Sequence, residues 1–126
     1  MDEREMARWL ALARMNVGAG LFALPGLAAA TWVGRDARSA GVRTFSRGFG
    51  VRDAIIGAGL FRALENGDAA EIRRWLLFGA AADAGDLVGT LASWRRLPPV
   101  RRTLVLAAIV GFGGLGLWLA NQFASA

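Results

Sequence analysis

The chain has 126 residues, of which 55% are hydrophobic, and a net charge of +5 from fifteen arginines and ten acidic residues. It contains no cysteine, histidine or lysine, which excludes disulfides, thiolate metal sites, histidine acid–base chemistry and lysine Schiff bases. The arginines lie between long apolar runs, which is typical of membrane flanks, and we expect no nucleic-acid partner.

The first predicted helix covers residues 9–33. Trp9 and Trp32 mark its ends, as aromatic residues do at membrane interfaces. Pro25 removes one backbone donor and predicts a kink. The residues before this helix carry three carboxylates and two arginines and so lack the positive bias of a signal peptide, and we expect a retained helix.

The second predicted helix covers residues 48–65 and is short for a membrane crossing. It carries Arg52 and Asp53 in its first half. Arg47 and Arg62 lie about 22 Å apart along an ideal helix. Their side chains can extend toward the two membrane surfaces, which would let the segment span.

The third and fourth predicted helices cover residues 72–94 and 103–124. Trp75 and Trp94 lie about 28 Å apart along an ideal helix, which matches a hydrocarbon core of about 30 Å. The fourth segment has no charged residue and follows a Pro-Pro pair that breaks the chain. Its length and composition indicate a transmembrane helix.

These segments predict one domain over residues 1–126: an all-α, integral membrane four-helix bundle with antiparallel neighbours. A soluble helical bundle is the alternative. Loops 34–47 and 95–102 hold eight arginines, against four on the other side. The positive-inside rule places both basic loops in the cytoplasm and both termini outside the cytoplasmic (inner) membrane of a bacterium, with membrane lipid as a partner.

Two carboxylates interrupt the third apolar segment. Asp83 and Asp86 are three residues apart, so they share a helix face, and Thr90 continues that face. Asp53 lies on a face of small residues in the second helix. If these helices are neighbours, Asp53 and Asp86 lie at similar depth.

Carboxylates inside a membrane require compensation. An ionised one costs at least about 2.5–3.5 kcal/mol at mid-membrane. Arg52 is nearest in depth, so we predict a polar, ligand-binding cluster of Asp53, Asp83, Asp86 and Arg52, with Thr90 beside it. Depth pairs Arg14 either with Asp83 or with the amides near the end of the fourth helix.

One short motif carries a resemblance. The stretch SRGFGVRDAIIGAG, residues 46–59, has the pattern G-x-R-D-x-x-x-G and precedes the D-x-x-D of Asp83 and Asp86. The chain resembles a family of small four-helix membrane proteins of bacteria and fungi known only as a domain of unknown function, and more distantly DoxX-type proteins. The resemblance implies a four-helix membrane fold and carries over no activity. It supports as pattern positions Gly50, Arg52, Asp53, Gly57, Asp83 and Asp86.

Three functions fit these residues. The first is binding of a small ligand, cation or proton at the intramembrane cluster, or its movement if the chain forms a homo-oligomer. The second is a membrane-embedded acid/base enzyme, an isomerase or cyclase of a lipophilic substrate, with Asp53, Asp83 and Asp86 as candidate catalytic groups. The third is a structural subunit in which Asp–Arg pairs lock the helices. We expect no cofactor, because the glycines of residues 111–116 lie within the chargeless helix. We expect no metal site, because the chain has no cysteine and no histidine.

Overall fold

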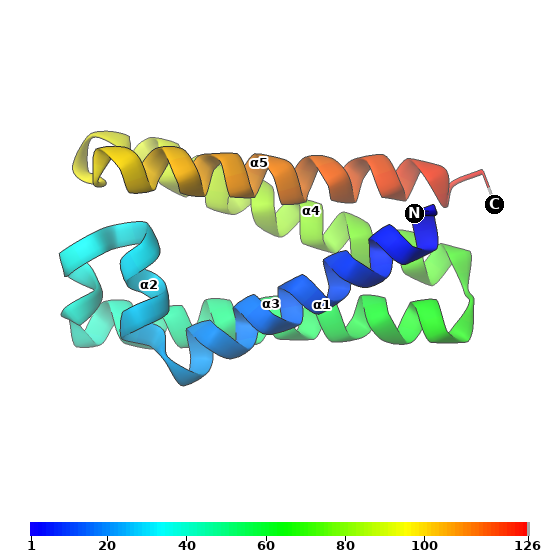
Figure 1. Cartoon of the computed structure of the whole chain (residues 1–126), viewed down its shortest axis with the longest axis horizontal. Coiled ribbons are helices and arrows are strands. Elements are labelled where there is room, and N and C mark those ends of the chain that lie inside the picture. The colour runs from blue at the N-terminus through cyan, green and yellow to red at the C-terminus, as the bar shows by residue number, and fades with distance from the viewer. Residues whose placement is uncertain (126) are drawn as a thin grey trace.

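The computed structural model describes residues 1–125, and over that range every regular element is a helix, which confirms the all-α prediction. The chain forms four long helices, a shorter one and two 3-10 turns. α1 begins and α5 ends at the same end of the molecule (Figure 1). The elements are α1 (Glu3–Ala23), α2 (Pro25–Val33), η1 (Gly34–Arg38), α3 (Ala40–Asn66), α4 (Ala69–Ala92), η2 (Trp94–Arg96) and α5 (Pro99–Gln122).

The expectation of one kinked helix over residues 9–33 is wrong. The chain leaves helical geometry at Leu24, and α1 makes an angle of 109° with the segment Pro25–Arg38. Pro25 starts α2, because a residue without an N–H is tolerated in a first helical turn and not in a helix interior. α2 then packs against α3 and α5, so it folds back instead of continuing α1 (Figure 1).

The second long helix, α3, starts eight residues earlier than the sequence pattern predicted. Ser39 caps α3 by accepting a hydrogen bond from the backbone N–H of Val42 at 3.2 Å. The expected loop 34–47 is therefore η1 followed by the first two turns of α3. α3 ends at Asn66, and the next residue, Gly67, has a φ of 73°, the left-handed conformation that terminates helices.

α1 and α3 approach each other through glycines. A Cβ atom built on Gly50 would lie 2.5 Å from the carbonyl oxygen of Gly18, and one on Gly57 would lie 2.6 Å from that of Ala11. The two backbones can touch only because these positions carry no side chain. The small-residue face expected on the second helix is therefore the face that contacts α1.

The apolar core lies toward the end of the molecule that holds the start of α1 and the end of α5. All four long helices contribute to it. The ring of Trp75 covers Gly59 there, which leaves no room for a Cβ. The large side chains that are fully buried in this core are Leu60, Ile72, Leu76 and Leu119.

One element of the described chain, α5, has the length and apolar composition to cross a membrane by itself. α1 and the segment Pro25–Arg38 reach the same criterion only as a bent pair. α3 and α4 differ because each carries two charged residues in its middle, Arg52 and Asp53 in α3 and Asp83 and Asp86 in α4, besides others nearer an end.

Candidate functional site

Three helices bring five charged residues together in the middle of the molecule. All lie in stretches that are otherwise uncharged, so each is placed by its helix and not by a flexible loop. We call this group the central charged cluster: Arg14 of α1, Arg52 and Asp53 of α3, and Asp83 and Asp86 of α4.

Arg14 occupies the buried side of this cluster, with 3% of its surface exposed. Its Nη2 donates to Oδ2 of Asp83, and its Nη1 lies 3.6 Å from Oδ1 of Asp53. The guanidinium lies over the ring of Phe112, 5.9 Å from the ring centroid. Gly79 provides the space, because a Cβ there would be 3.0 Å from Nε and Nη2 of Arg14.

Arg52 holds the outer side of the cluster. Its Nη1 and Nη2 donate to the two oxygens of Asp86 at 2.8 and 2.7 Å, the two-point geometry in which an arginine binds a carboxylate most strongly. The same side chain donates to Oδ1 of Asp53 at 3.2 and 3.3 Å and stacks on Phe49. Asp53 therefore lies between two arginines.

A cavity of about 340 Å³ adjoins the cluster, and all five of its charged residues line it. We call it the cluster cavity. Its other walls are mostly apolar and include Trp32, Val105 and Ile109. Within residues 1–125, Oδ2 of Asp53 and Oδ1 of Asp83 accept no hydrogen bond. Three carboxylates face two guanidinium groups here, so the fully ionised cluster carries one surplus negative charge.

Of the site residues expected from sequence, four come together and one does not. Asp53, Asp83, Asp86 and Arg52 belong to the cluster, although Arg52 makes its two-point contact with Asp86 rather than with Asp53. Thr90 is 2% exposed, and its Oγ1 makes no hydrogen bond in the described chain. It lines a neighbouring cavity of about 780 Å³, the Thr90 cavity, which also reaches Asp86 and Arg52.

Arg14 was not among the expected site residues. The sequence left its partner open between Asp83 and two amides, and the structure pairs it with Asp83. The amides, Asn121 and Gln122, are exposed at the end of α5. The available signal was that Arg14 is the one charged residue between Arg8 and Arg35.

Among residues 1–125, no three acidic residues are arranged to hold a metal ion. The contacts of the three aspartates are with arginines, so the site offers ion pairs, two free carboxylate oxygens and an apolar wall. No family model matches this chain, and no curated protein or solved structure is significantly similar to it. The resemblance to small four-helix membrane proteins stays a prediction.

Proposed function

We propose that this chain is an integral protein of the cytoplasmic membrane whose central charged cluster binds a small lipophilic cation. The proposed arrangement is an antiparallel four-helix bundle with four membrane units. One unit is α1 together with α2, and the other three are α3, α4 and α5. The basic loops face the cytoplasm. An assembly of several copies could move the cation, whereas a single copy would bind it.

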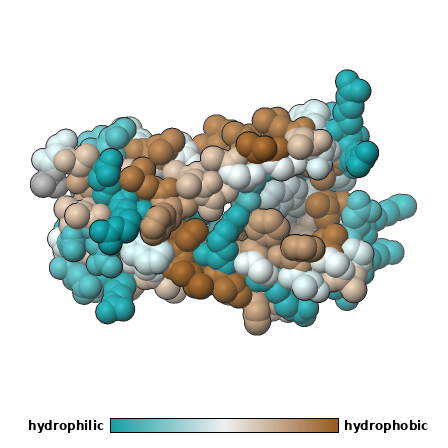
Figure 2. Space-filling model, turned by 180° about the vertical axis from the view of Figure 1, so that it is seen from behind, coloured by the Kyte–Doolittle hydropathy of each residue, from teal (hydrophilic) through white to brown (hydrophobic). Residues whose placement is uncertain are grey.

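The distribution of charge supports the membrane location. The five residues of the central charged cluster are paired with one another. The other twenty charged residues lie toward the two ends of the molecule. Figure 2 shows this on one face, where teal residues gather at both ends and brown and pale residues dominate between them. A membrane favours this pattern because unpaired charge in its interior is costly.

The exposed side chains support it as well. Only 22% of the most apolar stretch of α5 is buried, whereas the core helix of a soluble domain is mostly buried. Leu104 of α5 is 65% exposed and Val88 of α4 is 67% exposed. Large continuous apolar surfaces on a monomer mark contact with lipid or another protein.

The observation that carries the ligand proposal is that all five charged residues line the cluster cavity. A purely structural set of ion pairs would need no such space. A volume of about 340 Å³ is at the lower end of the range for small-molecule sites. The surplus negative charge and the free oxygens of Asp53 and Asp83 favour a cation with N–H donors, and the apolar wall favours a hydrocarbon tail. Protonated primary alkylamines have both features.

The test is a titration of the purified protein in detergent with butylammonium, hexylammonium and octylammonium, in a buffer without primary amines. Calorimetry gives Kd, and tryptophan fluorescence gives the thermal unfolding midpoint. At a hundredfold excess over Kd, binding should stabilise the protein by about 2.7 kcal/mol. Asp83→Asn should abolish the response while the protein remains folded.

The matched control is Glu65→Gln, which also converts a carboxylate to an amide. Glu65 pairs with Arg8 on the exposed surface, away from the cluster. This variant should bind alkylammonium ions as the parent does. If no alkylammonium ion binds the parent, or if Asp83→Asn binds equally well, the ligand proposal is wrong. A structural subunit would then be the better reading, with Asp83→Asn lowering stability alone.

A further inference from the structure

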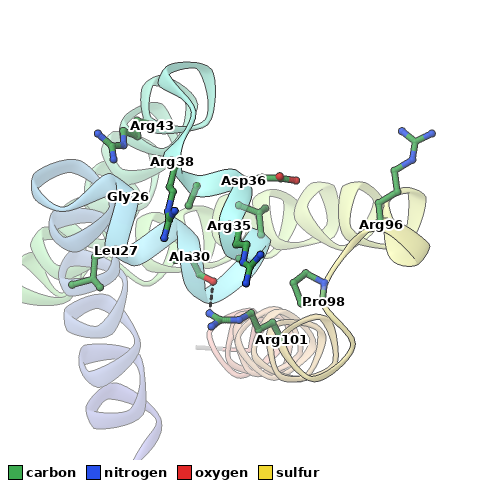
Figure 3. A pocket seen from close by; sticks show the side chains of 13 residues that line it. Gly26, Leu27, Ala30, Arg35, Asp36, Arg38, Arg43, Arg96, Pro98 and Arg101 are labelled. Carbon is green, nitrogen blue, oxygen red and sulfur yellow. Dashed lines mark hydrogen bonds between the residues drawn. The ribbon is translucent and has the colours of Figure 1, made fainter.

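Arginines from separate segments surround a third cavity at the end of the molecule opposite the apolar core. This basic cavity has a volume of about 800 Å³ and lies between α2, η1 and the start of α5 (Figure 3). Asp36 is the one acidic residue among those that line it. Its arginines are Arg35 and Arg38 of η1, Arg43 of α3, Arg96 of η2 and Arg101 of α5.

These arginines have little to bind within the protein. The ion pairs found in residues 1–125 involve Arg8, Arg14 and Arg52, and none involves an arginine of the basic cavity. Arg101 donates to the backbone carbonyl of Ala30, as the dashed line in Figure 3 marks. The arginines of the basic cavity therefore have no acidic partner in the described chain, although Arg96 points away from the cavity in Figure 3.

The fold holds this positive charge in place. Gly26 of α2 leaves room for Arg43, whose Nε would lie 3.2 Å from a Cβ at that glycine. α5 starts beside the cavity, and its cap residue Pro98 has no side chain that can accept from the first N–H groups. A helix start carries a partial positive charge, which adds to that of the arginines. The combined potential favours an anion.

The same cavity has an apolar side. Leu27, Val33 and Pro98 line it together with the arginines. Leu27 is 72% exposed. A soluble anion has no apolar part that could contact such a surface, whereas an anionic lipid presents a phosphate and hydrocarbon chains next to each other.

We infer that the basic cavity binds the phosphate of an anionic phospholipid, with the acyl chains against Leu27 and Val33. Arginine suits this role because its planar fork donates two hydrogen bonds to one phosphate. The inference rests on the proposed membrane location and is independent of the ligand at the central charged cluster. It explains why arginines of η1 and α5, far apart in sequence, line one space.

The experiment measures binding of short-chain phosphatidylglycerol and phosphatidylcholine to the full chain in a non-ionic detergent. Phosphatidylglycerol should bind at least about tenfold more tightly. Arg38→Gln combined with Arg101→Gln should raise its Kd by about tenfold or more. The control combines Arg73→Gln with Arg74→Gln, which removes the same charge at the opposite end and should leave Kd unchanged. Equal affinity for the two lipids, or equal losses in the two double variants, would overturn the inference.

Two further arms separate the alternatives. Glycerol phosphate and inorganic phosphate carry the anion without acyl chains and should bind far more weakly than phosphatidylglycerol. If either binds as tightly as the lipid, the cavity is a site for soluble phosphate and the lipid assignment fails. Asp83→Asn should retain full phosphatidylglycerol binding, so failure at the basic cavity and failure at the central charged cluster give different results.

Discussion

Adding one methyl group at Gly50 tests the contact that aligns Arg14 with Asp53. In Gly50→Ala the new Cβ would lie 2.5 Å from the carbonyl oxygen of Gly18 and 2.8 Å from the backbone nitrogen of Phe22. The first distance is 0.9 Å short of the 3.4 Å at which ordinary contact begins. Both neighbours are backbone atoms, so neither can rotate away and the helices must separate.

The change in the free energy of unfolding in Gly50→Ala can be compared with that of a control variant on the same helix. Overpacking of this kind costs about 1–3 kcal/mol. Gly48→Ala introduces the same methyl group where nothing lies within 4 Å. Alanine favours a helix over glycine by about 0.5–1 kcal/mol, so the control should be more stable than the parent. Both variants gain this helix preference, so they should differ in the free energy of unfolding by the overpacking cost alone, about 1–3 kcal/mol.

Unfolding in detergent, followed by tryptophan fluorescence, measures this difference. Gly50→Ala should also weaken hexylammonium binding, because separation of α1 from α3 moves Arg14 away from the aspartates. Equal unfolding midpoints for Gly50→Ala and Gly48→Ala would show that the backbones of α1 and α3 do not touch. The conclusion that this contact positions Arg14 beside the aspartates would then be wrong.

Three other variants test the site and the topology. Arg14→Met should lower the free energy of unfolding by about 3–5 kcal/mol by stranding buried carboxylates, and adding Asp83→Leu should recover part of that loss; thermal unfolding that shows no recovery would contradict the pairing. Gly79→Ala should weaken hexylammonium binding in calorimetry by displacing Arg14, whereas Gly85→Ala, which meets nothing within 4 Å, should not. In a chain without cysteine, Ala40→Cys should react with a membrane-impermeant thiol reagent only from the cytoplasmic side; labelling from outside would reverse the topology.

The parts of the site that could be predicted are those fixed by helical periodicity. The spacing of Asp83, Asp86 and Thr90 places them on one face, and in the structure Asp83 and Thr90 are buried. The depth of Arg52 along its helix was enough to bring it to the carboxylates. Thr90 lies on the same face of α4 as Asp83 and Asp86. It is one turn further along the helix, which is too far to join the ion pairs.

What could not be predicted depends on tertiary packing. Pro25 indicates a kink, but the angle of 109° follows from where α2 finds a surface on α3 and α5. Ser39 is a good helix cap, but the sequence pattern assigns Arg43 and Arg47 after it to a loop. The cavity that Arg43 lines also involves α5, a segment distant in sequence. The partner of Arg14 depends on the glycine contact between α1 and α3, which no local pattern specifies.

The ion pair between Arg52 and Asp86 links two consecutive helices. Under the proposed membrane location, this pair has a consequence for biogenesis. Each unpaired charge at mid-membrane costs at least about 2.5–3.5 kcal/mol, so neither α3 nor α4 is favourable as a solitary inserted segment. Joined by the turn at Gly67, the two helices can neutralise part of that charge against each other as they leave the translocon. We therefore expect α3 and α4 to enter the bilayer as a hairpin, with insertion and folding as one step rather than two.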